Sequence, residues 1–334
     1  MVEMLWQKVP ILGVCFISFF RLKANQRITM MNKTLSTICL LLCAASMFAQ
    51  DLKPFELTDA WLASVDEVAP SSTTVSVRKK KTLLIFSLHT GFEHWTIPHT
   101  EAVVKLIAEK SGAFKVVTSK DISVFEKDNL KNYDAVVLNN NCSISDERNI
   151  FWDVLKKDST LTEQVARMKA KQLEDNLLSY VDRGGGLVVL HGAITMENKS
   201  DNFSQMVGGS FDYHPKQQSI AVKLVDPKHP MVQAFGGEGF EHVDEAYIFN
   251  NAYSQYNFHP LLYMEADKIS GLKEPIGDNI KYISWIKRYG KGHVFYSSPS
   301  HNAQAFENPK LLRFFLDGIQ YAVGDLKCDD SPIR

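Results

Sequence analysis

Unbroken apolar runs mark the first half of this chain. The clearest, residues 187–190, follows three glycines and ends at His191 and Gly192. A run that does not alternate with polar residues is typical of a strand buried on both faces, as in a parallel sheet. Similar runs predict further strands at residues 82–87, 114–118 and 133–138. The pattern therefore predicts a mainly parallel central sheet.

Apolar residues with helical spacing lie between and after these strands. They predict helices at residues 97–110, 161–181 and 309–323, and a short helix at residues 59–65. Strands that alternate with helices favour an α/β fold with right-handed crossovers. The second half is less regular, and its pattern predicts strands at residues 219–225, 261–265, 282–286 and 293–297. Residues 80–325 fit a single domain.

The first 49 residues have the pattern of a targeting sequence. A basic residue, Lys33, precedes an apolar run at residues 38–47, and Ala49 supplies a small residue before a cleavage point. We therefore expect a signal peptide at residues 31–49 that directs the protein to the periplasm or outside the cell. Residues 1–30 are interpreted as an upstream extension from a start codon placed too early.

Two alternatives for the N-terminal region are less favoured. The apolar residues 9–20 are too few to span a bilayer comfortably. A lipid anchor on Cys43 is disfavoured because lipoprotein cleavage requires a small residue just before the cysteine, where this chain has leucine. Residues 50–79 are polar and are interpreted as a leader or linker. The mature chain is therefore expected to have no membrane span.

Charge and cysteine content narrow the function classes. Loss of residues 1–49 removes five basic residues and one acid, which changes the formal charge from −1 to −5. Without a basic stripe, a nucleic-acid-binding surface is excluded. Cys142 and Cys328 remain, and a chain this large does not need a disulfide to stabilise its core. The sequence leaves their pairing open.

Histidines follow several of the predicted strands. All ten lie between His89 and His301. Because ligands bind at the carboxyl ends of parallel strands, histidines at these ends are candidates for a site. Imidazole is the usual general acid–base near neutral pH and the commonest metal ligand. For each histidine singly, a structural role is the alternative.

An acidic segment and several aromatic residues add candidates. Asp244 and Glu245 follow His242 and are able to orient a histidine, accept a proton or bind sugar hydroxyls, unless they lie in a solvated loop. Aromatic rings stack on sugar rings, although most buried ones simply fill a core. Cys142 is a weak candidate nucleophile because no adjacent base is visible. The sequence has no nucleophile elbow, phosphate loop, dinucleotide fingerprint or zinc-protease motif.

These motifs together resemble one known family. Residues 89–94 resemble the Gly-Phe-x-His motif of the ThuA-like (trehalose utilisation) family, and the resemblance continues through residues 184–193, 208–214, 244–247 and 290–301. It implies a flavodoxin-like three-layer α/β sandwich over residues 80–325, related to class I glutamine amidotransferases. Those relatives carry a cysteine nucleophile in the turn where this chain has His191. The resemblance therefore argues against amidotransferase chemistry.

The resemblance also implies a function, because ThuA-like proteins are associated with sugar catabolism and 3-keto-disaccharides. We expect a carbohydrate-catabolism enzyme that acts on oxidised (3-keto) glycosides by acid–base isomerisation, elimination or hydrolysis. Its expected partner is a small-molecule carbohydrate, and the sequence does not indicate an oligomeric state. A non-catalytic carbohydrate-binding accessory protein and a conventional glycoside hydrolase stay open as alternatives.

The candidate residues divide into three roles. The candidate catalytic residues are His191, Glu245 and Asp244. The candidate substrate-binding residues are His89, Phe92, Trp95, Tyr213 and Tyr247. The candidate ligands of a divalent metal, which would polarise a ketone, are His94, His214 and His301.

Overall fold

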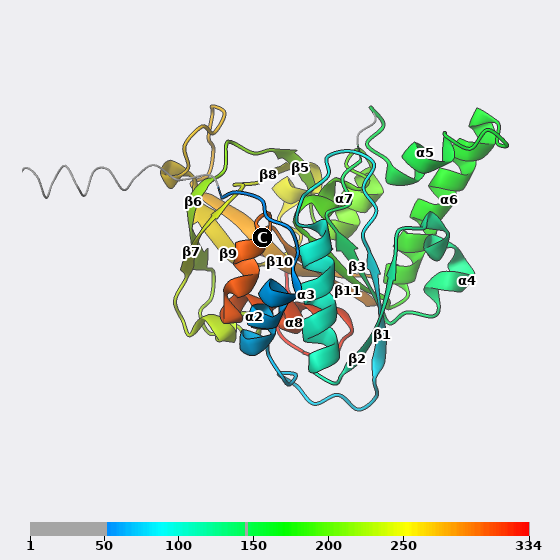
Figure 1. The fold of residues 1–334 in the computed structure, drawn as a ribbon. Coiled ribbons are helices and arrows are strands. Elements are labelled where there is room, and N and C mark those ends of the chain that lie inside the picture. Colours follow the sequence, from blue (N-terminus) through cyan, green and yellow to red (C-terminus); the bar gives the residue numbers. More distant parts are fainter. Residues whose placement is uncertain (1–51, 144–145, 334) are drawn as a thin grey trace, which may run out of the picture. The chain divides into compact units, whose positions relative to one another are not determined.

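A single large sheet organises the described part of the chain. The computed structural model describes residues 52–143 and 146–333. Its main sheet has the strand order β2-β1-β3-β4-β11-β10-β9-β6-β7 (Figure 1). The predicted signal peptide lies outside the described residues.

The first five strands in this order are parallel, as the unbroken apolar runs predict. They are β2 (Phe114–Ser119), β1 (Lys81–Phe86), β3 (Ala135–Asn139), β4 (Gly186–Leu190) and β11 (Gly292–Ser297). The order 2-1-3-4 followed by a last strand is that of a flavodoxin-like sheet. Every residue of β3 and β4 is buried, which explains why their sequences do not alternate. The carboxyl ends of these strands therefore meet along one edge.

Four antiparallel strands extend the sheet on the β11 side. They are β10 (Ile280–Tyr289), β9 (His259–Glu265), β6 (Gln218–Leu224) and β7 (Phe240–Asp244). A separate antiparallel pair is formed by β5 (Ser210–Tyr213) and β8 (Ile248–Asn250). The hydrophobic pattern does not predict β5, β7 or β8, because these strands are short and partly polar.

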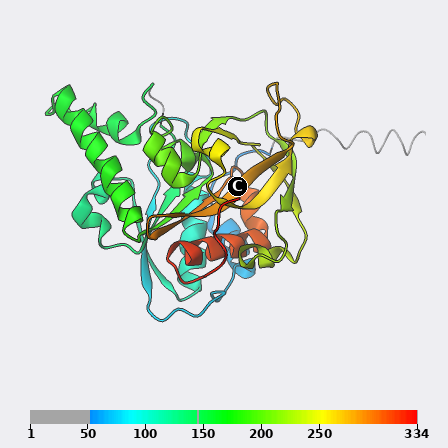
Figure 2. The same cartoon turned by 180° about the vertical axis from the view of Figure 1, so that it is seen from behind.

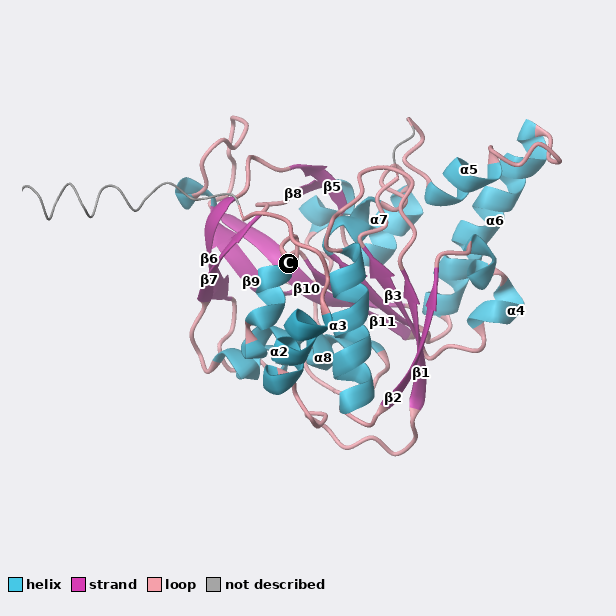
Figure 3. Ribbon diagram, viewed as in Figure 1, coloured by secondary structure: helices cyan, strands magenta, loops and turns pink. Residues whose placement is uncertain are grey.

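Helices cover both faces of the sheet, so the predicted three-layer sandwich is confirmed (Figures 2 and 3). One face carries α2 (Asp59–Val68), α3 (Ile97–Lys110) and α8 (Pro309–Ala322). The other carries α4 (Lys127–Leu130), α5 (Ile150–Leu155), α6 (Glu163–Asp182) and α7 (Asp201–Val207). The helix predicted at residues 59–65 is present as α2. Within the described residues, none of the helices combines the length and apolar character that a bilayer crossing requires.

Two glycines let α8 pack closely on the centre of the sheet. A Cβ at Gly318 would lie 2.2 Å from the ring of Phe295 on β11, and one at Gly186 would lie 2.5 Å from the carbonyl oxygen of Ala322. Real Cβ atoms essentially never approach other atoms this closely. The close packing of α8 fixes β4 and β11, the two strands that deliver His191 and His301.

Helix α8 carries a buried acid with an altered pKa. Asp317 is 2 % exposed and accepts a hydrogen bond of 2.5 Å from Thr74 Oγ1. Burial raises the pKa of Asp317 from 3.8 to about 6. Between these values the folded state keeps a proton that the unfolded state releases. The contribution of Asp317 to stability therefore falls as the pH rises from 3.8 to about 6.

We expect Asp317→Asn to remove this pH dependence. Relative to the variant, the wild-type protein should lose on the order of 3 kcal/mol of unfolding free energy between pH 4 and pH 7. Denaturant unfolding at the two pH values measures this difference. The exposed Asp128 provides the control, since Asp128→Asn should leave the pH dependence almost unchanged. Equal pH dependence of wild-type and Asp317→Asn proteins would contradict the prediction.

Candidate functional site

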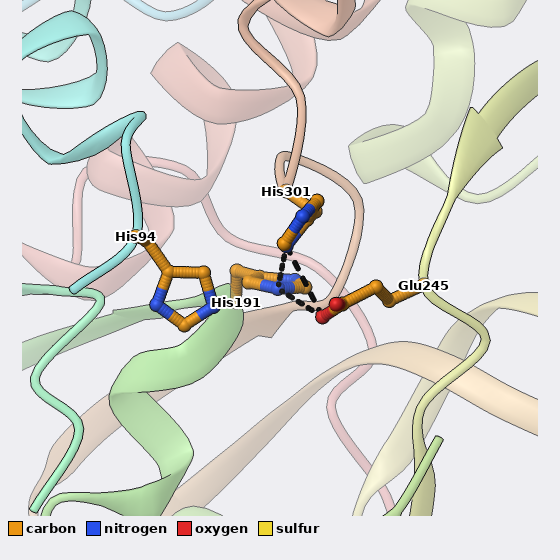
Figure 4. A group of neighbouring side chains, drawn as sticks. All are labelled: His94, His191, Glu245 and His301. Carbon is orange, nitrogen blue, oxygen red and sulfur yellow. Dashed lines mark hydrogen bonds and ion pairs between the residues drawn. The ribbon is translucent and has the colours of Figure 1, made fainter. Parts of the chain in front are cut away.

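Three histidines meet at the carboxyl edge of the parallel strands. His94 lies in the loop after β1, His191 directly follows β4, and His301 lies in the loop after β11. Glu245 reaches the same point from the loop between β7 and β8 (Figure 4). One ligand atom from each of these four side chains lies within 4.8 Å of the other three.

Glu245 is the centre of this group. Its Oε2 lies 3.3 Å from His191 Nε2 and 3.1 Å from His301 Nδ1. Its Oε1 lies 3.5 Å from His214 Nε2. The two imidazole nitrogens nearest to Oε2 are themselves 3.2 Å apart. The carboxylate therefore contacts two buried histidines with one oxygen and the more exposed His214 with the other.

The turn after β4 holds His191 in a strained conformation. His191 has a φ of 47°, which is uncommon for a residue other than glycine and is often found at functional sites. Its Nδ1–H donates a hydrogen bond of 2.7 Å to the carbonyl oxygen of Ser298. The next amide, Gly192 N–H, donates to Asn140 Oδ1 at 3.1 Å. These bonds fix the ring so that Nε2 points at Glu245.

Gly192 is required at its position by close contacts. A Cβ there would lie 2.6 Å from His94 Cε1 and 3.0 Å from Cys142 Sγ. The absence of a side chain therefore allows the His94 ring to approach His191, with the two ring centroids 5.0 Å apart.

Asp244 holds the backbone of the site in place through hydrogen bonds. It is 1 % exposed and does not line the cavity described below. Its Oδ1 accepts the Glu245 amide at 2.7 Å, and its Oδ2 accepts the amides of Ser300 and His301 at 3.0 and 3.4 Å. The geometry thus makes Asp244 a positioning residue that fixes the backbone on both sides of the Glu245–His301 contact. Its predicted catalytic role stays a prediction.

Asp244→Ala is expected to destabilise the protein by about 2–4 kcal/mol, because it leaves buried amides without an acceptor. Asp244→Asn keeps one side-chain carbonyl oxygen as an acceptor, so it should lose less unfolding free energy than Asp244→Ala. Denaturant unfolding of both variants tests the ranking. Stabilities equal to that of the wild-type protein would contradict the positioning role.

Burial and mutual contacts set the charge state of the site. Although burial raises the pKa of Glu245, contacts with His191 and His301 outweigh it and hold that pKa well below its ordinary value. Burial lowers the pKa of His301, but the hydrogen bond to Glu245 reverses this and raises it overall. Burial and the neighbouring histidines lower the pKa of His94 well below 6.5. The cluster therefore favours a carboxylate, and His94 is held neutral.

A cavity of about 250 Å³ opens onto this cluster. Of the predicted residues, it is lined by Phe92, His94, His214, Glu245 and Tyr247. The Phe92 side chain is 63 % exposed at this cavity, and its ring contacts the His94 ring. This volume is slightly smaller than that of typical ligand pockets, which span roughly 300–1,000 Å³. The cavity is therefore large enough for a small group or for one part of a larger ligand.

The cavity is also lined by Cys142, the weak candidate nucleophile, and by three residues that the candidate set did not include: Arg148, Thr195 and Phe211. Burial raises the pKa of the Cys142 thiol to about 11, which disfavours a thiolate nucleophile. The Cys142 sulfur instead contacts His94 Nδ1 at 3.7 Å and donates to the Gly192 carbonyl at 3.5 Å. Phe211 lies in the motif at residues 208–214, which could have indicated it, whereas Arg148 belongs to no motif and the sequence offers no signal for it.

Three predicted substrate-binding residues lie elsewhere in the structure. His89 lines a separate hollow with Val154 and contacts Glu93. Trp95 packs its ring against Phe55, with the two centroids 5.2 Å apart. Tyr213 accepts the Lys273 amide and lies beneath the Lys273 ammonium. None of the three lines the cavity beside Glu245.

Comparison with known proteins supports the fold. A family model described as ThuA, trehalose utilisation, matches residues 82–322. A ThuA-like protein from Bacteroides uniformis aligns at TM-score 0.55 and 16% identity, covering 76% of this chain and 95% of that one. A ThuA-like protein from Parabacteroides merdae aligns at TM-score 0.51 and 21% identity, covering 77% and 98%. A search of curated proteins returned no match.

Proposed function

We propose that this chain, which belongs to the ThuA family of trehalose utilisation, is an enzyme that acts on oxidised (3-keto) glycosides or disaccharides. Membership of the family implies a role in carbohydrate metabolism. The observation that carries the proposal is the histidine–glutamate cluster at the base of a cavity of about 250 Å³.

The chemistry follows from the carbonyl group. A ketone acidifies the neighbouring C–H bond, so a base removes that proton and an enolate forms. The enolate then expels the glycosidic oxygen as the C–O bond breaks, and an acid returns a proton to the leaving oxygen. Return of the proton to carbon instead gives isomerisation, and addition of water to the eliminated product completes a hydrolysis.

The burial and contacts of the histidines support a different role for each of them. His191 is fully buried and does not line the cavity, so it and His301 hold the Glu245 carboxylate in place. His214 lines the cavity, and its side chain is 34% exposed. Its contact with Glu245 Oε1 orients the imidazole. We therefore assign proton transfer with substrate to the His214–Glu245 pair, with His191 required to position it.

A conventional glycosidase is disfavoured by the cavity. Such enzymes use two carboxyl groups that flank the scissile bond. Among the described residues that line this cavity, Glu245 is the single carboxylate. A non-catalytic sugar-binding protein is the second alternative, but it has no need for a buried histidine–carboxylate cluster.

Incubation of the purified protein with a 3-keto-disaccharide and with its unoxidised parent tests the proposal. We expect turnover of the oxidised sugar alone. Cleavage of the unoxidised parent would favour the glycosidase. A binding protein would show a raised melting temperature with sugar while leaving the sugar unchanged.

We also propose that the protein is exported through the signal peptide at residues 31–49. The apolar run at residues 38–47 and the small residue Ala49 support this. N-terminal sequencing of the mature protein should begin at Gln50. An N-terminus at Met1, or a fatty acid on Cys43, would refute the proposed processing.

A further inference from the structure

Three donor atoms at the centre of the site form a nearly equilateral triangle. The sides are 3.3 Å from His191 Nε2 to Glu245 Oε2, 3.1 Å from Glu245 Oε2 to His301 Nδ1, and 3.2 Å between the two nitrogens. When ligands lie about 2.0–2.2 Å from an ion, neighbouring donors are about 2.8–3.6 Å apart. The triangle therefore has the dimensions of one face of a metal coordination shell.

The hydrogen-bond directions favour a cation at this point. Because His191 Nδ1–H donates to Ser298 O, a neutral His191 presents the lone pair of Nε2 to the carboxylate oxygen of Glu245. Two lone pairs at that distance repel unless a proton or a metal ion lies between them. A single proton removes this repulsion along one side of the triangle, whereas one metal ion bonds to all three donor atoms at once.

His94 provides a fourth donor. It belongs to the group of ligand atoms within 4.8 Å of one another, and it is 2 % exposed. Its Nδ1 contacts Cys142 Sγ, which leaves the opposite ring nitrogen available to the cluster.

The surroundings also match those of known metal sites. Histidine ligands usually donate their second ring N–H to a carbonyl or carboxylate, as His191 does to Ser298 O. The backbone on either side of the carboxylate and of His301 is fixed by Asp244. The cavity reaches Glu245 and His94, so a bound ion would have a side open to substrate.

We propose that this site binds one divalent transition-metal ion, with Zn²⁺ or Mn²⁺ as the favoured metals. Its ligands are His94, His191, Glu245 and His301. Two histidines and a carboxylate on one face are a recurring arrangement for such ions, and imidazole disfavours Mg²⁺ and Ca²⁺. His214, which the sequence placed among the metal ligands, lies outside this group and contacts the other oxygen of Glu245.

The role of the ion in catalysis rests on the proposed function. A metal ion that binds the ketone oxygen stabilises the negative charge of the enolate. His214 lies outside the four ligands. Its Nδ1 donates to the Pro215 carbonyl oxygen and its Nε2 lies beside Glu245 Oε1, which is the pair assigned to take the proton from carbon. Binding of the ion itself does not depend on the identity of the sugar.

Metal binding is measured on the purified full chain without sugar, so its failure is distinguishable from failure of the proposed carbohydrate chemistry. The protein is stripped with a chelator and titrated calorimetrically with Zn²⁺, Mn²⁺ and Mg²⁺. We expect one Zn²⁺ or Mn²⁺ per chain and at least 10-fold weaker binding of Mg²⁺. Glu245→Gln and His301→Gln should each weaken Zn²⁺ binding by at least about 100-fold.

Two matched variants serve as controls. His214→Gln removes the histidine that contacts Glu245 Oε1, and His89→Gln removes one from a separate hollow. Both should keep one Zn²⁺ per chain. Because ligand variants are able to misfold, Co²⁺ is also added to the wild-type protein, where visible absorption bands should report nitrogen ligation. Absence of those bands, no Zn²⁺ or Mn²⁺ binding, or equal affinity in Glu245→Gln would overturn the proposal.

Discussion

A His191→Asn protein is expected to fold and to lose about 10²–10⁴-fold of its turnover of a 3-keto glycoside. Asparagine tolerates the left-handed backbone that His191 adopts, with φ of 47°, better than most residues do. It is also small enough for this fully buried position. It does not place a nitrogen where His191 Nε2 lies, so Glu245 loses one of its two buried partners.

Initial rates and thermal melting of the same preparation measure this effect. The control is His89→Gln, since His89 lines a separate hollow and should not affect turnover. Wild-type turnover in a well-folded His191→Asn protein would refute the role of His191 in catalysis and would indicate a purely structural role at the end of the strand. Glu245→Gln, which keeps the size of the side chain, gives a second variant if His191→Asn does not fold.

Removal of the proposed metal ion is expected to reduce turnover by a similar factor. If the ion polarises the ketone, a chelator should reduce turnover by at least about 10³-fold, because an ion supplies several kcal/mol of charge stabilisation. Addition of Mn²⁺ or Zn²⁺ to the stripped enzyme should restore the rate. Full turnover after complete removal of metal would show that the histidines act without an ion.

The sequence predicts the parallel half of the fold because its strands are buried on both faces. The run at residues 187–190 has no polar position, and the structure buries all of β4. The short strand β7 was not predicted. Its residues 240–244 include glutamate, histidine and aspartate, and only Asp244 among them is buried. Pairing with β6 forms this strand, and that is a long-range contact which local patterning does not show.

Part of the site is also predictable from the sequence, because the carboxyl ends of neighbouring parallel strands meet at one edge of the sheet. His191 and His301 follow strands that lie side by side, so their convergence follows from the parallel sheet. His89 also follows a strand, but the direction of its loop places it in a separate hollow. Trp95 packs against Phe55, which lies in the segment at residues 50–79 that was interpreted from the sequence as a leader or linker. The direction in which a loop turns depends on tertiary packing, and the residue types alone do not encode it.

Exchange of the substrate C–H proton with solvent is the decisive measurement for proton abstraction at this site. A 3-keto-disaccharide is incubated with the enzyme in D₂O, and the proton next to the carbonyl is followed by NMR. We expect wild-type enzyme to remove this proton signal at least as fast as the sugar is consumed, and Glu245→Gln to leave it unchanged. Cleavage of the sugar with that proton fully retained would contradict the proposed mechanism, because the bond would then break without proton abstraction from carbon.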